Sequence, residues 1–198
     1  MSILCVKQEI LTEQLCLWEE GELPSLPKPK SISDWFQWQV GIWAGGEITK
    51  DSSPMEIRTK INQIEHLMFA AVDEGVMEDT NPTYSLKHTF APGVYGREMH
   101  IPAGHVVVGK LHKHSLLNIL IKGKVTVITE QEGIKEYNAG DVFSSPIGTK
   151  RLLVTHEDTV WVGIHPTDET DLDKIEAEFI AKSYTELGWE QPKLLTEG

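Results

Sequence analysis

The spacing of hydrophobic residues divides the chain into four parts. Residues 1–52 have no regular period, and residues 53–77 have the period of a helix. Residues 84–166 alternate as β-strands do, and residues 167–198 return to a helical period. The sequence therefore predicts an irregular arm, an amphipathic helix, a β-domain, and an acidic C-terminal helix with a tail.

The predicted arm, residues 1–52, is rich in proline and tryptophan. Three prolines lie within residues 23–30, which prevents a continuous helix there and favours an extended linker. Four of the six tryptophans of the chain precede residue 44. Aromatic side chains of this kind either pack onto the main domain as a lid or form a contact with a partner or a second copy.

The predicted helix over residues 53–77 has a recognisable start and end. Ser53 suits the N-cap, Pro54 suits the first helical position, and Glu56 completes a capping box. Gly75 is well placed to end the helix. One apolar stripe recurs at steps of three and four: Ile57, Ile61, Ile64, Met68 and Ala71.

Short segments rich in Val, Ile and Thr, separated by turn residues, fill residues 84–166. The predicted strands are Leu86–Phe90, Tyr95–Ile101, His105–Leu111, Leu117–Ile121, Lys124–Thr129, Lys150–Thr155 and Thr159–Ile164. So many strands in about eighty residues, with no helix between them, are typical of an antiparallel sandwich or barrel. The predicted fold class is mainly β.

The last helix is predicted from a second capping pattern, Thr170 with Asp173. Its apolar stripe consists of Leu172, Ile175, Phe179 and Ile180, and Gly188 is expected to end it. We expect this helix to pack against the sheet or against a neighbouring subunit.

Composition and charge exclude several classes of function. The 198 residues carry a net charge of −12, whereas a nucleic-acid-binding surface needs clustered Lys and Arg. No apolar run is long enough to cross a membrane, and residues 1–15 do not resemble a secretory signal. Cys5 and Cys16 form neither a metal motif nor a disulfide framework. We therefore expect a cytoplasmic protein that binds neither nucleic acid nor membranes.

Seven of the eight histidines lie between residues 88 and 165. Two of them, His112 and His114, are two positions apart in a segment predicted to be extended. Residues i and i+2 of a strand project to the same face, so both imidazoles are expected to point to one centre. Imidazole is the commonest protein ligand of Zn, Fe, Ni and Cu.

The surroundings of this pair resemble the cupin superfamily over roughly residues 84–166. In cupins a first motif supplies His-x-His and a glutamate before a strand that ends in glycine, here Gly123. A second motif runs glycine, five residues, Pro-x-Gly, two residues and histidine, and is matched by Gly140, Pro146 and Gly148. The resemblance implies an antiparallel jelly-roll barrel, a metal centre held by both motifs, and a homo-oligomer, a dimer or larger.

Two positions depart from the cupin motifs. The first motif is shortened by two residues, and Asn118, five residues before Gly123 and on the same strand face as a residue seven before it, stands in for the glutamate with only an amide oxygen. Arg151 replaces the second-motif histidine. Arginine stays protonated and cannot bind a metal. Three interpretations remain open. His112, His114 and Asn118 hold a divalent metal (Zn, Ni, Fe or Mn), or Arg151 beside the imidazoles binds a small anion such as a carboxylate or phosphate, or the barrel is filled and binds nothing.

His156 and His165 are further candidates for ligand binding. His156 precedes a predicted hairpin turn, which places it at a rim. His165 shares one strand face with Trp161 and Gly163. The opposite face, Val160, Val162 and Ile164, is the more natural core set, so His165 is expected outside the barrel or at its rim.

Two functional hypotheses follow. The first is a cupin that binds a divalent metal, a small anionic ligand, or both in its barrel, with any enzymatic activity being metal-dependent. The second is a non-catalytic structural or interaction protein that uses the barrel as an oligomerising scaffold. Residues 148–166 are also similar to small cupins of tailed bacteriophages, which implies a place in the host cytoplasm or on a virion.

Overall fold

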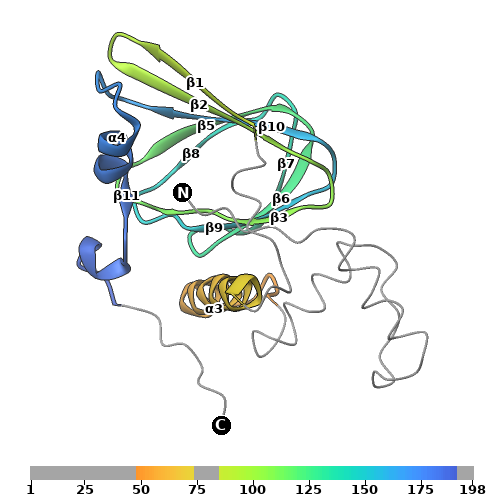
Figure 1. The fold of residues 1–198 in the computed structure, drawn as a ribbon. Helices are drawn as coiled ribbons and strands as arrows, with labels where there is room; N and C mark the ends of the chain where they lie inside the picture. The colour runs from red at the N-terminus through yellow and green to blue at the C-terminus, as the bar shows by residue number, and fades with distance from the viewer. Residues whose placement is uncertain (1–47, 74–84, 191–198) are drawn as a thin grey trace.

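A computed structural model describes residues 48–73 and 85–190 of the chain (Figure 1). Two antiparallel sheets face each other, helix α3 lies beneath one of them, and helix α4 lies at one end of the barrel. Nearly all of the predicted arm, including Cys5 and Cys16, lies outside the described residues.

Helix α3 (Pro54–Asp73) begins at the predicted capping box. The backbone N–H of Ser53 donates to Glu56 Oε2 over 2.7 Å, and that of Glu56 donates to Ser53 Oγ over 3.3 Å. The predicted apolar stripe is buried at Ile57, Ile61, Ile64 and Met68, and the helix contacts strand β6 (Lys124–Thr129) of the four-stranded sheet. The predicted end at Gly75 lies outside the described residues.

The five-stranded sheet has the order β1-β2-β10-β5-β8. Its strands are β1 (Leu86–Ala91), β2 (Val94–Ile101), β10 (Thr159–His165), β5 (Leu116–Lys122) and β8 (Val142–Ser145). The four-stranded sheet has the order β3-β9-β6-β7, and its other strands are β3 (Val106–Val108), β9 (Arg151–Thr155) and β7 (Gly133–Asn138). A third, two-stranded sheet pairs β4 (Leu111–His112) with β11 (Ile180–Ala181).

All of these pairings are antiparallel, so the predicted mainly β jelly-roll fold is confirmed. Every predicted strand is present, although Gly109 and Lys110 divide one of them into β3 and β4. Strands β7, β8 and β11 were not predicted. Their exposed and short segments give no clear alternation.

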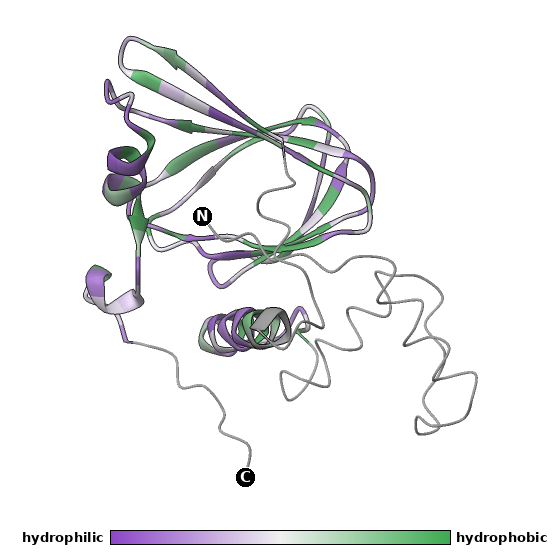
Figure 2. Cartoon of the chain, viewed as in Figure 1, coloured by the Kyte–Doolittle hydropathy of each residue, from purple (hydrophilic) through white to green (hydrophobic). Residues whose placement is uncertain are grey.

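One end of the space between the sheets is an apolar core. Leu120 and Val125, from opposite sheets, are completely buried there. Their cluster consists of Ile101, Val107, Leu120, Val125, Val127, Tyr137, Leu153 and Trp161. Hydrophobic residues recur along the strands that enclose it, whereas α3 and α4 carry hydrophobic and hydrophilic residues side by side (Figure 2).

Helix α4 (Leu172–Phe179) corrects the predicted ends of the C-terminal helix. Asp171 is the N-cap instead of Thr170, because its Oδ1 accepts the backbone N–H of Asp173 over 3.0 Å. The helix ends at Phe179 because the next two residues pair with β4 as β11. Gly188, with φ +73°, ends a separate 3₁₀ helix η2 (Tyr184–Leu187).

The predicted packing of this helix against the sheet is confirmed. Ile175 and Phe179 are buried together with Tyr95 of β2, whereas Leu172 is exposed. Among the described residues, neither α3 nor α4 is both long and apolar enough to cross a membrane.

Candidate ligand-binding cavity

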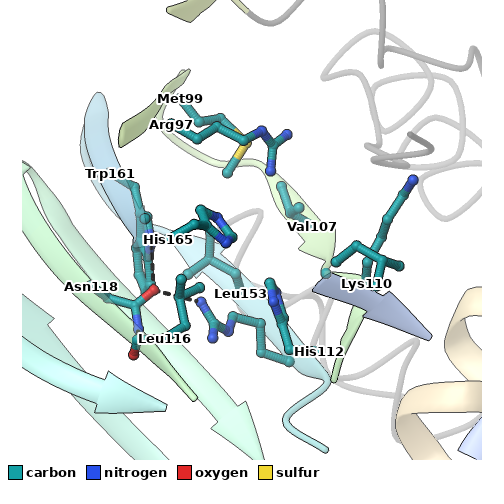
Figure 3. A pocket seen from close by; sticks show the side chains of 14 residues that line it. Arg97, Met99, Val107, Lys110, His112, Leu116, Asn118, Leu153, Trp161 and His165 are labelled. Carbon is teal, nitrogen blue, oxygen red and sulfur yellow. Dashed lines mark hydrogen bonds between the residues drawn. The ribbon is translucent and has the colours of Figure 1, made fainter. Parts of the chain in front are cut away.

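Beside α4, the barrel interior opens into a cavity of about 80 Å³ (Figure 3). Strands of both main sheets line it, together with β4, β11 and the two residues between β3 and β4. Its polar lining consists of Arg97, Lys110, His112, Asn118, Arg151 and His165. The rest of the lining is apolar or glycine: Met99, Val107, Gly109, Leu116, Leu153, Trp161, Gly163 and Ile180.

A glycine in the central strand leaves room for the cavity. The strand register aligns Arg97 of β2, Gly163 of β10 and Asn118 of β5 in one row across the sheet. A Cβ atom on Gly163 would lie 3.6 Å from His165 Nε2 and 3.6 Å from Leu116 Cδ2, which are ordinary contact distances. Larger side chains here would therefore enter the cavity.

A closed hydrogen-bond network centred on Arg151 forms one wall. Its Nη1 donates to Asn118 Oδ1 over 3.1 Å, and its Nη2 donates to Ser145 Oγ over 2.8 Å. Trp161 Nε1 donates to the same Asn118 oxygen over 3.1 Å, and Asn118 Nδ2 donates to Ser145 Oγ over 2.9 Å. The guanidinium carbon of Arg151 also lies 5.3 Å from the centre of the Trp161 ring.

The cavity is electropositive. Among the described residues that line it, Arg97, Lys110 and Arg151 are cationic and none is an aspartate or glutamate. Arg151 makes no ion pair with a carboxylate in the part of the chain that the structure describes, and burial lowers its pKa to about 10. Lys110 pairs with Glu176 of α4.

Two neutral imidazoles stack in the cavity. The ring centres of His112 and His165 are 6.3 Å apart. Burial, and then the charge of Arg97, lowers the pKa of His165 to about 4. Burial, and then the charge of Arg151, lowers the pKa of His112 well below its usual value. His165 Nδ1 is buried and has no hydrogen-bond partner within the described segments.

The cavity leads outward into a wider pocket of about 280 Å³ between β2 and α4. Arg97, Lys110, His112, His165 and Ile180 line both spaces. The Phe179 ring of α4 meets the His165 ring edge to face, with centres 4.8 Å apart. Helix α4 and the ion pair between its Glu176 and Lys110 therefore border the entrance to the cavity.

The predicted metal ligands are not brought together. His112 lines the cavity, but β4 ends at this residue and the chain bends at Lys113 and His114. His114 is therefore exposed, with its ring centre 5.2 Å from that of Phe179. Asn118 faces inward as its spacing predicts, but its amide oxygen already accepts two hydrogen bonds. No group of three His, Cys, Asp or Glu side chains within residues 48–73 and 85–190 suits a metal ion, so the residues do not fit the predicted metal site.

The two additional histidine candidates lie in different places. His156 is exposed at the turn between β9 and β10, and its Nε2 lies 2.7 Å from Thr126 Oγ1, outside the cavity. The expectation that His165 lies outside the barrel or at its rim is wrong, because it is buried and lines the cavity. Trp161 belongs to the apolar core, and this turns the face that it shares with His165 inward.

Sequence reasoning missed Arg97 and Lys110. Arg97 alternates with Tyr95 and Met99 along β2, so a charged residue stood on an otherwise apolar strand face. That pattern is visible in the sequence and marks Arg97 as a candidate. Lys110 lies in the gap between β3 and β4, where no periodicity applies.

Comparison with known proteins finds similarity only to solved structures of low sequence identity. No protein-family model matches the chain, and no curated protein matches it. Solved structures do resemble it, including a putative ethanolamine utilization protein Q from Salmonella typhimurium LT2, with 13% identity and a TM-score of 0.37 over 43% of this chain and 71% of that one. A cupin-2 domain protein from Shewanella frigidimarina has 12% identity and a TM-score of 0.36, covering 48% of this chain and 99% of that one.

KdgF from a Halomonas species has 18% identity and a TM-score of 0.40, covering 48% of this chain and 88% of that one. At these identities and TM-scores the similarities carry no conclusion about ligand or reaction. The antiparallel jelly-roll observed in the described β-domain is the topology that the cupin-like motif spacing implies.

Proposed function

We propose that the barrel cavity binds a small organic anion, a carboxylate with a short apolar part. The observation that carries this proposal is the set of cations Arg97, Lys110 and Arg151 around a cavity whose described lining has no carboxylate. The chain as a whole has a net charge of −12, so this concentration of positive charge runs against its overall composition.

The lining suits both parts of such a ligand. Arg97 lines both the cavity and the outer pocket, and its planar guanidinium matches a carboxylate in two parallel hydrogen bonds. The unpartnered Nδ1 of His165 supplies a further hydrogen-bonding group. Met99 and Leu153 offer apolar surface to a short hydrocarbon part.

The test is calorimetric titration of the protein with acetate, butyrate, hexanoate, succinate and inorganic phosphate. We expect a carboxylate with a hydrocarbon part to bind more tightly than phosphate. Arg97→Gln should weaken its binding by about tenfold or more, since a bidentate charged contact is lost. Failure of every compound to bind would contradict the proposal.

Two glycine variants separate a cavity effect from a general effect on the sheet. Gly163→Val fills the cavity without removing a charge, whereas Gly96→Val adds the same side chain to β2, where a Cβ atom would lie 3.8 Å or more from its nearest neighbours. We expect Gly163→Val to abolish binding and Gly96→Val to retain it. Equal affinities in the two variants would place the ligand outside the cavity.

A second candidate function, an oligomerising scaffold, is favoured by the outer face of the five-stranded sheet. Leu117, Ile121 and Val142 are 44%, 54% and 60% exposed there. They adjoin further partly buried aliphatic residues, Ile119, Val160, Val162 and Ile164. Contiguous exposed apolar surface of this kind is typical of protein interfaces. We propose a second copy of the chain as its partner, and a phage or virion association rests on the sequence resemblance alone.

Light scattering coupled to size-exclusion chromatography tests the scaffold. The wild type is expected to be a dimer or larger, and the double substitution Leu117→Lys and Ile121→Lys is expected to dissociate it. Lys135→Glu, on exposed strand β7 of the other sheet, serves as the charge control and should leave the mass unchanged. A monomeric wild type would contradict this proposal and would leave the cavity proposal intact.

A further inference from the structure

The two departures from the cupin motifs contact each other. Asn118 stands at the position of the acidic ligand and Arg151 at that of the second-motif histidine. Although they are 33 residues apart in sequence, Arg151 Nη1 donates to Asn118 Oδ1 over 3.1 Å. The two replacements therefore form one arrangement instead of two separate losses.

This arrangement uses the atoms that a metal would need. An amide oxygen has two lone pairs, and those of Asn118 are taken by Arg151 and Trp161. The second guanidinium nitrogen of Arg151 bonds Ser145 Oγ. The positive charge of Arg151 also lies in the same cavity as His112, the one predicted metal-ligating histidine there, and so opposes a metal cation.

The charges of the two arrangements agree. A divalent cation with a carboxylate ligand carries one net positive charge, and so does a guanidinium with a neutral amide. We infer that Arg151 is a built-in substitute for the metal ion: its guanidinium takes the place of the cation, and Asn118 takes the place of the carboxylate ligand. The barrel thereby keeps a fixed positive centre that does not depend on a supply of metal.

The test is metal uptake by the full-length protein. Wild-type protein is stripped with a chelator, titrated with Co²⁺ and Zn²⁺, dialysed, and measured by visible absorption and elemental analysis. The substitution pair Asn118→Glu and Arg151→His, which returns both ligands, is measured in parallel, with and without His112→Ala. We expect no stoichiometric metal in the wild type, tight binding in the pair, and loss of that binding when His112 is removed.

Stoichiometric metal in the wild type that disappears in His112→Ala would overturn the inference. A folded Asn118→Glu/Arg151→His protein that takes up no metal would also overturn it. If that pair does not fold, Arg151→Met replaces it, because methionine removes the charge and keeps much of the volume. Arg151→Met should then bind Co²⁺ more tightly than the wild type. Equal Co²⁺ affinity in the two proteins would refute the inference that Arg151 takes the place of the metal ion.

These measurements are independent of the anion. The carboxylate titrations are run in chelator-treated buffer, so a failure of anion binding leaves the metal result untouched. Conversely, metal in the wild type would refute the role of Arg151 without excluding a carboxylate from the cavity.

Discussion

The two ends of the barrel interior are built from the same strands but differ in chemistry. On β5, Leu120 lies in the apolar core and Asn118, two residues earlier, belongs to the polar network. On β10, Trp161 contacts both regions and His165 lines the cavity. The apolar end gains free energy by burying hydrocarbon, whereas the cavity end buries a charge without an ion-pairing carboxylate in the described chain. Substitutions at the two ends are therefore expected to change stability in opposite directions.

The largest effect is expected at the apolar end. Leu120→Ala removes a completely buried side chain and should lower the free energy of unfolding by about 3–4 kcal/mol, measured by urea denaturation. Leu117→Ala is the matched control on the same strand, because this leucine is 44% exposed on the outer face. Similar losses for both variants would show that the apolar end does not dominate stability.

Arg151→Met tests the opposite sign. The substitution removes a buried charge. Asn118 Oδ1 still accepts the hydrogen bond from Trp161 Nε1, and Ser145 Oγ still accepts the one from Asn118 Nδ2. We therefore expect the free energy of unfolding to rise by about 1–2 kcal/mol in chemical denaturation. Arg58→Met, which removes a guanidinium paired with Glu130, should lower stability instead. A loss in Arg151→Met would show that its hydrogen bonds outweigh the cost of burying the charge.

The dependence of stability on pH should also come from the cavity end. The pKa of His165 is about 4 in the folded protein and near 6.5 when unfolded, so between these values the unfolded chain binds a proton that the folded one excludes. The free energy of unfolding should have its full value above about pH 6.5 and should fall as the pH is lowered towards 4. Denaturation midpoints of His165→Gln should fall less steeply over this range. An unchanged slope in His165→Gln would contradict the assignment.

The smallest effect on stability is expected for Gly163→Ala. The added methyl group makes ordinary contacts, and alanine costs less conformational entropy than glycine in a strand, so the change should stay within about 1 kcal/mol. Carboxylate affinity, in contrast, should fall measurably because the methyl group takes cavity space. In thermal denaturation Gly96→Ala should change stability as little as Gly163→Ala does. It should leave the carboxylate affinity unchanged.

Local patterns predicted much of this molecule. The capping box at Ser53, the apolar stripe of α3 and all seven predicted strands are present, because caps and periodicity depend on residues close in sequence. The inward position of Asn118 also followed from motif spacing. His114 did not follow its predicted strand face, since β4 stops at His112 and the period of two stops with it.

His165 shows a different limit of sequence reasoning. Alternation placed it correctly on the face of Trp161 and Gly163, but alternation does not say which face of a strand points inward. Here the large Trp161 side chain is buried and the aliphatic face lies outside, where the exposed residues of β5 and β8 adjoin it. Packing between the two sheets decided the orientation.

The sequence by itself determined the start of α3, the seven predicted strands, the jelly-roll class and the two motif positions that depart from cupins. The tertiary structure decided that Arg97, Gly163 and Asn118 form one row, that Arg151 bonds Asn118, and that α4 borders the entrance. The physical reason is strand register. Antiparallel pairing brings together residues tens of positions apart, and only the packed sheets fix which side chains then share one enclosed space.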